Sequence, residues 1–197
     1  MEEDNPKYEI TSDTLLWNSF RLGDDKSLEN IYRTYVKTLF HYGSKFTNDK
    51  EFVIDCIQEV FVDLFVHRKN LGETNNIKLY LFLSLKRKII HSLQKKGFVQ
   101  FLPDEALPFL SNYSTEEEIS DKESDMVLLS KLSKALETLS LCQKEAIYLR
   151  FSCELKYEEI CQIMDLNYQS VRNLVHRSIE KLRKILVCSS FFLLLHL

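Results

Sequence analysis

The chain has 197 residues, 45% of them hydrophobic and 28% charged, and this ordinary globular composition excludes a collagen-like, mucin-like or wholly disordered protein. With only four glycines and three prolines, it lacks the turn residues that a β-sandwich or β-barrel needs. The net charge of −3 does not indicate a polyanionic partner, and the length allows one domain of middling size or two small ones.

Neither terminus predicts export or a membrane span. The first ten residues are acidic and have no apolar core, and the longest apolar stretch, 185–197, is shorter than the ~20 residues of a span. The five cysteines are odd in number and show no C-x-x-C spacing, which argues against a disulfide scaffold or a zinc site. We therefore expect a cytoplasmic protein with reduced thiols, no metal site and no cofactor.

Apolar residues recur at helical spacing from residue 14 to residue 96. After Glu51, one apolar stripe is predicted to face the core: Ile54, Ile57, Phe61, Leu64 and Phe65. Gly and Asn interrupt the pattern at 69–76, so a loop is expected there. A further helix is predicted from Ile77 to about Lys96, with these residues inward: Leu79, Phe82, Leu83, Ile90 and Leu93.

The helix after Glu51 also has a polar face, which comprises Asp55, Gln58, Glu59, Val62 and Asp63. Paired carboxylates can serve acid–base catalysis or bind a metal, but both uses need burial or further ligands, and no second cluster supplies them. A solvated acidic face and an interface for a basic partner helix both remain open from the residues alone.

The helix from Ile77 to Lys96 contains six basic residues and no acidic one. One of its faces interleaves cations with other polar groups: Tyr80, Ser84, Arg87, Lys88, His91 and Lys95. This pattern suits contact with a nucleic-acid backbone and some stacking on bases. A basic surface helix without a partner is the alternative.

Residues 104–125 contain eight acids and one lysine, with little periodicity. A segment of this composition cannot bury enough apolar surface to fold alone and is typical of a linker. Without its charge of −7, the rest of the chain has a net charge of +4 (−3 + 7). The tether either simply joins two basic modules or also covers their basic faces.

Residues 128–186 are predicted to be helical again and to contain a helix-turn-helix. Its first helix spans Tyr157–Met164, a three-residue turn ends at Asn167, and the second helix begins at Tyr168. The side chain of Asn167 is placed to cap the second helix.

The second helix has one polar face, which comprises Gln169, Arg172, Asn173, His176, Arg177 and Glu180. The residues expected to contact DNA are Gln169, Ser170, Arg172, Asn173, His176 and Arg177. Arg, Asn and Gln present donors in the geometry that base edges and phosphates accept. A solvated amphipathic helix is the alternative, although such helices more often have Glu and Lys pairs. The sequence has no Walker loop and no G-x-G-x-x-G, H-E-x-x-H or G-x-S-x-G motif, so neither an enzyme nor a small-molecule substrate is expected.

Taken in order, these segments resemble a known family. The motif D-C-I-Q-E-V-F at 55–61 looks like the helix by which bacterial sigma factors of the sigma-70 family bind core RNA polymerase. Residues 135–151 and 157–183 are similar to the C-terminal sigma domain and its helix-turn-helix. The order resembles the two-domain, extracytoplasmic-function (ECF) type, and S-V-R-N-L-V-H-R-S-I-E-K-L-R-K is closest to sigma factors of the Bacteroidetes lineage.

The resemblance implies an all-α protein of two small helical domains. Residues 14–100 would form region 2, which binds core polymerase and the melted downstream promoter element. Residues 128–186 would form region 4, which binds the upstream element. The acidic linker would be 101–127, and an apolar tail would follow at 187–197. The polymerase contacts would be Asp55, Gln58, Glu59, Phe61 and Val62. An anti-sigma factor is a plausible further partner.

The chain departs from the family at two positions in its basic helix. Arg87 stands where the family usually has Asn, and Gln94 where it usually has Arg. Three hypotheses follow: a sigma factor that reads promoters itself, a sigma-like subunit whose site is chosen by another DNA-bound factor, and a plain helix-turn-helix regulator. The apolar tail is predicted to be a packing or partner-binding segment, with a membrane-surface anchor as the alternative.

Overall fold

The computed structural model describes residues 12–95, Phe109 and 123–194, and for 123–129 and 187–194 it describes the backbone alone. Within these residues all regular structure is helical, which confirms the all-α prediction. The N-terminal unit contains α1 (Ser12–Arg21), α2 (Asp25–Gly43), α3 (Lys50–His67), the short turn η1 (Arg68–Asn70) and α4 (Ile77–Lys95). The C-terminal unit contains α5 (Glu123–Glu137), α6 (Leu141–Ile147), the π-helical turn η3 (Tyr148–Ser152), α7 (Tyr157–Met164) and α8 (Tyr168–Leu194).

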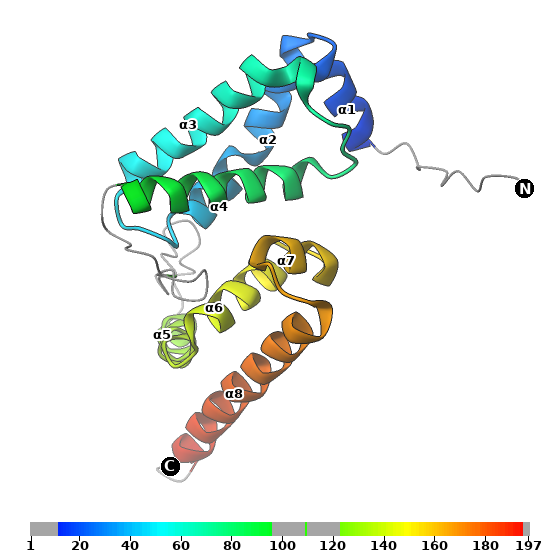
Figure 1. Ribbon diagram of the computed structural model, residues 1–197. Coiled ribbons are helices and arrows are strands. Elements are labelled where there is room, and N and C mark those ends of the chain that lie inside the picture. The colour runs from blue at the N-terminus through cyan, green and yellow to red at the C-terminus, as the bar shows by residue number, and fades with distance from the viewer. Residues whose placement is uncertain (1–11, 96–108, 110–122, 195–197) are drawn as a thin grey trace, which may run out of the picture.

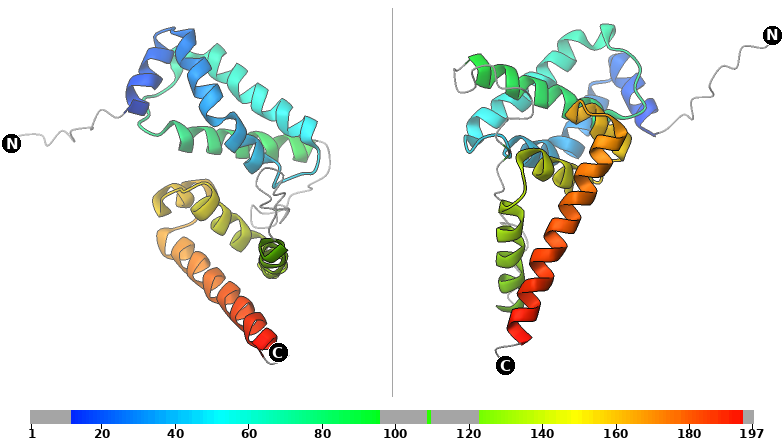
Figure 2. Two further views of the ribbon diagram at one scale, coloured as in Figure 1. Left: turned by 180° about the vertical axis from the view of Figure 1, so that it is seen from behind. Right: turned by 60° about the horizontal axis from the view of Figure 1, so that its bottom comes forward.

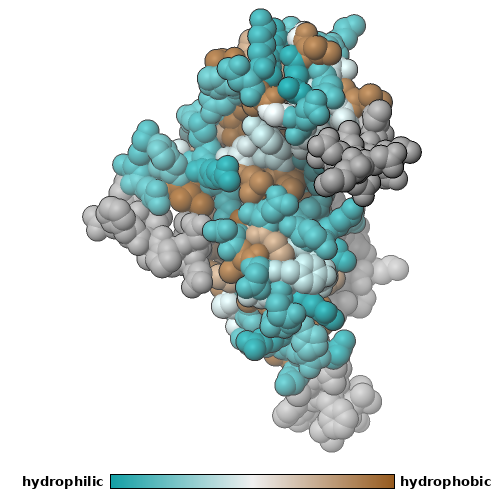
Figure 3. All heavy atoms as spheres, turned by 45° about the vertical axis from the view of Figure 1, so that its right-hand side comes forward, coloured by the Kyte–Doolittle hydropathy of each residue, from teal (hydrophilic) through white to brown (hydrophobic). Residues whose placement is uncertain are grey.

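The two units lie against each other, with α7 packed on α4 (Figure 1). From this contact α8 leads away to the C-terminus, with α5 beside it (Figure 2). One face of the molecule is mostly hydrophilic, and its hydrophobic residues gather in separate patches (Figure 3). No helix in the described ranges has both the length and the apolar character needed to cross a bilayer.

The N-terminal unit is a bundle in which α2, α3 and α4 pack on one another and α1 packs on α2. The closest approach is at Gly43, where an added Cβ would lie 2.6 Å from a methyl group of Val53. Glycine therefore lets α2 approach α3. The side chain of Asp49 caps α3 by accepting the N–H of Phe52 at 3.0 Å.

The buried face of α3 differs from the predicted stripe. Ile54 and Phe65 are 43% and 47% exposed, so the prediction that they face the core is wrong. The covered side chains are Val53, Cys56, Ile57, Val60, Phe61 and Leu64. The packed face is therefore rotated relative to the predicted one, because Val53 and Val60 occupy positions that the predicted stripe left out.

The helix-turn-helix forms at the predicted residues. Asp165 ends α7 in the left-handed conformation (φ 52°, ψ 44°), which Asp tolerates better than most residues. The side chain of Asn167 then accepts the N–H of Ser170 at 2.8 Å, which confirms the predicted cap. The second helix, α8, continues to Leu194, beyond the predicted end of the helical segment at 186 and into the predicted tail. Residues 195–197 lie outside the described part of the chain.

A buried ion pair joins the two units. The ammonium of Lys86 in α4 lies 2.9 Å from a carboxylate oxygen of Glu145 in α6 and donates to the carbonyl of Ile163 at 3.0 Å. The hydroxyl of Tyr42 donates to the same oxygen of Glu145 at 2.9 Å. Burial, and then the neighbouring carboxylate, holds the pKa of Tyr42 well above its usual value, so this hydroxyl remains a donor.

An aromatic cluster lies beside the ion pair, and one of its members comes from the predicted tether. Phe109 is 4% exposed, and its ring centroid lies 5.5 Å from that of Phe46 and 5.8 Å from that of Tyr148. The tether is therefore held at this residue. Its other residues up to 122 lie outside the described part, and α5 begins at Glu123, earlier than the predicted start of the second helical segment at 128.

We predict that Lys86→Ala lowers the free energy of unfolding by about 3–5 kcal/mol, because it leaves the carboxylate of Glu145 buried without its cation. A matched control is Arg33→Ala, which removes a 2.7 Å ion pair with Glu29 between exposed side chains. The control should cost less than about 1 kcal/mol. Urea denaturation followed by circular dichroism measures both, and equal effects would contradict the structural role of the Lys86 pair.

We also predict that Asn167→Ala destabilises the C-terminal unit by about 1 kcal/mol, because the first turn of α8 loses its cap. Asn167→Asp keeps a side-chain oxygen at the same place and should retain most of the stability. Hydrogen exchange of the first amides of α8 measures the effect locally. Similar exchange in the Ala and Asp variants would show that the cap is unimportant.

Candidate nucleic-acid and protein interfaces

The polar face of α8 is open to solvent, as a DNA-reading face requires. The side chains of Gln169, Arg172, Asn173, His176 and Arg177 are exposed, whereas Ser170 is half-buried. The opposite face of α8 is buried at Val171, Val175 and Ser178, and the hydroxyl of Ser178 is satisfied by the carbonyl of Leu174 at 2.6 Å.

Two amide side chains on this open face are linked by a hydrogen bond, which restricts the conformations of both. The side chain of Gln169 donates to that of Asn173 at 3.0 Å, one helical turn away. Arg172 and Arg177 flank Asn173 and have no protein partner among the described residues, so their donors can bind base edges or phosphates. The buried back of α8 fixes the direction in which they point.

The polar face of α3 combines carboxylates with apolar groups. Asp55, Gln58 and Glu59 are exposed, and Val62 and Val66 beside them are 58% and 65% exposed. Residues three or four apart lie side by side on a helix. Asp55, Gln58, Glu59, Val62 and Val66 follow this spacing and form one surface, here called the α3 face. Exposed apolar side chains rimmed by acids are typical of a protein-docking surface.

Phe61, a predicted polymerase contact, is buried and does not belong to the α3 face. Its side chain is only 7% exposed, and its ring packs edge-to-face on Tyr32 with centroids 5.0 Å apart. Phe61 instead joins α3 to α2. The sequence analysis missed Val66, although its position one turn after Val62 was a usable signal.

The predicted DNA residues of α4 fall into two groups. Arg87, His91 and Lys95 are exposed and lie one turn apart; the charges of Arg87 and Lys95 give this row its name here, the cationic row. The other three, Tyr80, Ser84 and Lys88, are half-buried and line a cavity of about 190 Å³ between α3 and α4. The remaining lining residues are Val60, Asp63, Leu64, His67 and Leu71.

Lys88 connects the cavity to the α3 face. Its ammonium lies 2.8 Å from the carboxylate of Asp63 and 3.2 Å from that of Glu59. The hydrogen bond that Lys88 donates to Asp63 raises the pKa of Lys88, so the amine remains charged. Lys88 is therefore already paired with acids, unlike the cationic row.

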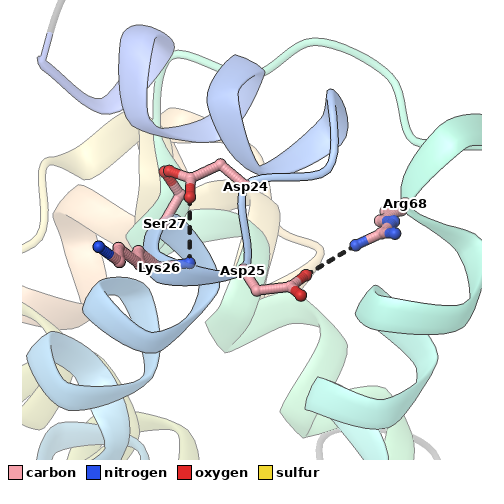
Figure 4. A network of polar contacts seen from close by, with 5 residues as sticks. All are labelled: Asp24, Asp25, Lys26, Ser27 and Arg68. Atoms are coloured by element: carbon pink, nitrogen blue, oxygen red, sulfur yellow. Dashed lines mark hydrogen bonds and ion pairs between the residues drawn. The ribbon is translucent and has the colours of Figure 1, made fainter.

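The segment that leads from α3 to α4 is held at its start by a polar network (Figure 4). The guanidinium of Arg68 forms a 2.9 Å ion pair with Asp25 at the start of α2 and lies 4.9 Å from the ring centroid of Phe65. The preceding residue, Asp24, accepts the Ser27 hydroxyl at 2.5 Å, and this bond lowers the pKa of Asp24. The start of the loop is thus tied to the α1–α2 connection.

Sequence reasoning counted Lys86 among the surface cations of the basic helix and did not separate it from the rest. The available signal was that Lys86 lies one turn after Phe82 and one turn before Ile89, on the apolar side of the helix. Two further polar residues near the start of α4 also meet the C-terminal unit: Asn76 donates to Glu159, and Lys78 donates to the carbonyl of Cys153.

Comparison with known families matches two segments of the chain. Residues 31–99 match sigma-70 region 2, and residues 129–182 match sigma-70 region 4. Among curated proteins of Bacillus subtilis (strain 168), the RNA polymerase sigma factor SigZ is 28% identical over 81% of this chain and 87% of its own length. The ECF RNA polymerase sigma factor SigM is 21% identical over 81% of this chain and 94% of its own.

Two solved structures share the fold. CnrH, solved in complex with the cytosolic domain of CnrY, gives a TM-score of 0.60 at 15% identity and covers 90% of this chain and 99% of its own. The sigma factor RpoE from Bartonella quintana, solved with the anti-sigma factor NepR, has a TM-score of 0.57 at 19% identity. The match covers 82% of this chain and 97% of RpoE. With both sigma regions present in order, the chain belongs to the sigma-70 family and is a sigma factor that binds core RNA polymerase and directs initiation at promoters.

Proposed function

We propose that the chain is an ECF-type sigma factor of the Bacteroidetes lineage and that the predicted division of labour holds along it. Residues 14–100 bind core polymerase and the downstream element, 101–127 link the domains, and 128–186 bind the upstream element. The protein acts beside polymerase in the cytoplasm and catalyses no reaction itself. The main support is that one chain presents an acidic and apolar α3 face and, separately, an exposed face on α8 that contains Arg172, Asn173 and Arg177.

The α3 face suits a basic partner helix on the polymerase. Its exposed acids attract the basic partner and fix how the two helices align. Val62 and Val66 supply apolar surface that is removed from water on docking. The contact set is Asp55, Gln58, Glu59 and Val62, with Val66 in place of the buried Phe61.

The basic helix and the cavity suit an unpaired DNA strand. Arg87, His91 and Lys95 would follow its phosphates, and the cavity beside Tyr80 and Ser84 would admit an unstacked base. On α8, Gln169, Arg172, Asn173, His176 and Arg177 would read the upstream element as duplex, and Ser170 would contact its backbone from the start of the helix.

A second candidate function is a sigma subunit that is recruited to its site by another DNA-bound factor. Arg87 and Gln94, the two departures from the family, are both exposed two turns apart on α4, so both would face the melting strand. The double variant Arg87→Asn with Gln94→Arg should increase initiation by polymerase alone under this alternative. Unchanged initiation would remove the reason for it.

An inhibitory protein partner is also part of the proposal. The fold is shared with a sigma factor that was solved with its anti-sigma factor, and this chain has exposed apolar residues on α3 that such a partner could cover. The C-terminal extension of α8 toward Leu194 is proposed to pack or bind a partner rather than to anchor the protein on a membrane.

We predict that Asp55→Ala combined with Glu59→Ala abolishes binding to core polymerase while upstream-element binding survives, because the α3 face loses both of its central carboxylates. Glu29→Ala with Glu137→Ala removes the same charge from exposed positions elsewhere and should leave binding unchanged. Analytical ultracentrifugation with core polymerase measures both. Undiminished binding by the first variant would refute the assignment of the α3 face.

We predict that Arg172→Ala or Arg177→Ala weakens upstream-element binding by about 1–3 kcal/mol where a base contact is lost. Arg183→Ala is the matched control, because Arg183 is an exposed residue of the same helix and forms a 3.2 Å ion pair with Glu180. Binding assays across salt concentration and across mutated sites distinguish base from phosphate contacts. If neither arginine variant differs from the control, α8 does not read the element with this face.

A further inference from the structure

Helix α1 contacts the loop between α3 and α4 at three successive points. The carboxylate of Asp13 accepts the N–H of Ile77 at 3.0 Å, and the indole N–H of Trp17 donates to the carbonyl of Gly72 at 2.8 Å. Arg21 forms a 3.7 Å ion pair with Glu73. Residues 13, 17 and 21 are four apart, so they form one stripe along α1, here called the α1 stripe.

Trp17 makes the central contact of the α1 stripe. Its side chain is fully buried, with the ring centroid 5.0 Å from that of Tyr80 and 5.6 Å from that of Phe20. A buried indole N–H needs a partner, and here the partner is the backbone of the loop. Trp17 therefore fixes the loop through its N–H and the first turns of α4 through its ring.

Leu71 is partly buried against the core, but Gly72 itself is exposed, and a Cβ added there would have no heavy atom within 4 Å. The hydrogen bond from Trp17 therefore holds the loop at a residue whose own position is open. Arg21 adds less, because the carboxylate of Glu73 is 78% exposed and the pair is screened by water.

The fixed loop borders the cavity assigned above to an unstacked base. Leu71, next to Gly72, lines the cavity, and so does Tyr80, which packs against Trp17. Glu73 and Asn75 are exposed on the same loop, so their side chains are available to a DNA strand. Any shift of the loop would change both the cavity and these side chains.

We propose that the α1 stripe is a positioning device that holds loop 71–76 in the shape in which it discriminates bases of the melted downstream element. The inference rests on the proposed downstream role of α4 and of the cavity that this loop borders. The stripe itself touches no DNA. Because the loop is already ordered, DNA binding does not have to pay the conformational entropy of ordering it. The rigid rim of the cavity favours one base because it cannot adapt its shape to another.

The variant that isolates this role is Trp17→Phe, which keeps an aromatic ring against Tyr80 but has no N–H for Gly72. The freed carbonyl can bind water, so the loop is released without a new unsatisfied group. Phe20→Leu is the matched control, because Phe20 is a fully buried neighbour of Trp17 and has no hydrogen bond to the loop. Gly72→Ala keeps the carbonyl and should behave like the wild type.

The first readout is transcription by core polymerase and the full chain from promoters with a randomised downstream block. Trp17→Phe should reduce the enrichment of the preferred bases by about tenfold, the factor expected for one buried hydrogen bond, while polymerase affinity and upstream preference stay the same. Phe20→Leu should keep the wild-type enrichment. Unchanged enrichment in Trp17→Phe, or equal loss in Phe20→Leu, would overturn the inference and leave the proposed function standing.

Absence of any downstream preference in the wild type would instead refute the downstream role itself, and the inference with it. A second readout needs no promoter. Hydrogen exchange of the amides of 71–77 in the full chain should be about tenfold faster in Trp17→Phe and in Asp13→Ala than in Phe20→Leu. Equal exchange in all variants would show that the α1 stripe does not hold the loop.

Discussion

The arrangement of this protein depends on one buried ion pair between its two halves. Lys86 lies among apolar residues of α4, and removing its charge from water is costly unless the ammonium is fully paired. Glu145 and the carbonyl of Ile163 supply that pairing from the C-terminal unit, and Tyr42 completes the shell of the carboxylate. Because the partners come from both units, the charge is satisfied only while α4, α6 and α7 stay together.

This contact decides which surfaces remain open. One side of α4 packs on α7, and the residues near its start, Asn76 and Lys78, also bind the C-terminal unit. The cationic row on α4, the α3 face and the polar face of α8 are exposed outside this contact. The chain therefore presents its polymerase surface and its duplex-reading surface at once.

Much of the fold could be predicted from the sequence because local signals specify it. The boundaries of α7 and the start of α8 follow from apolar spacing and from one capping residue, Asn167, which forms the predicted bond. The exposed face of α8 could be predicted for the same reason, since its back is apolar apart from the small residue Ser178. Local chemistry and tertiary packing agree in this segment.

The errors arose where packing from several directions decides burial. Periodicity identified α3 as a helix, but only its neighbours α2 and α4 determine that Val53 and Val60 are covered while Ile54 and Phe65 are not. The burial of Phe61 against Tyr32 could not be predicted either, because it depends on a contact between helices. Composition described the tether as polar overall and therefore hid the buried aromatic residue Phe109.

The central claim is that this chain alone directs polymerase to promoters. The most direct test is transcription from fragmented host DNA by core polymerase with and without the protein, with start sites mapped. The account predicts new starts that share an upstream motif in two blocks. Stable polymerase binding without specific starts would favour a recruited sigma subunit, and the absence of polymerase binding would contradict the account.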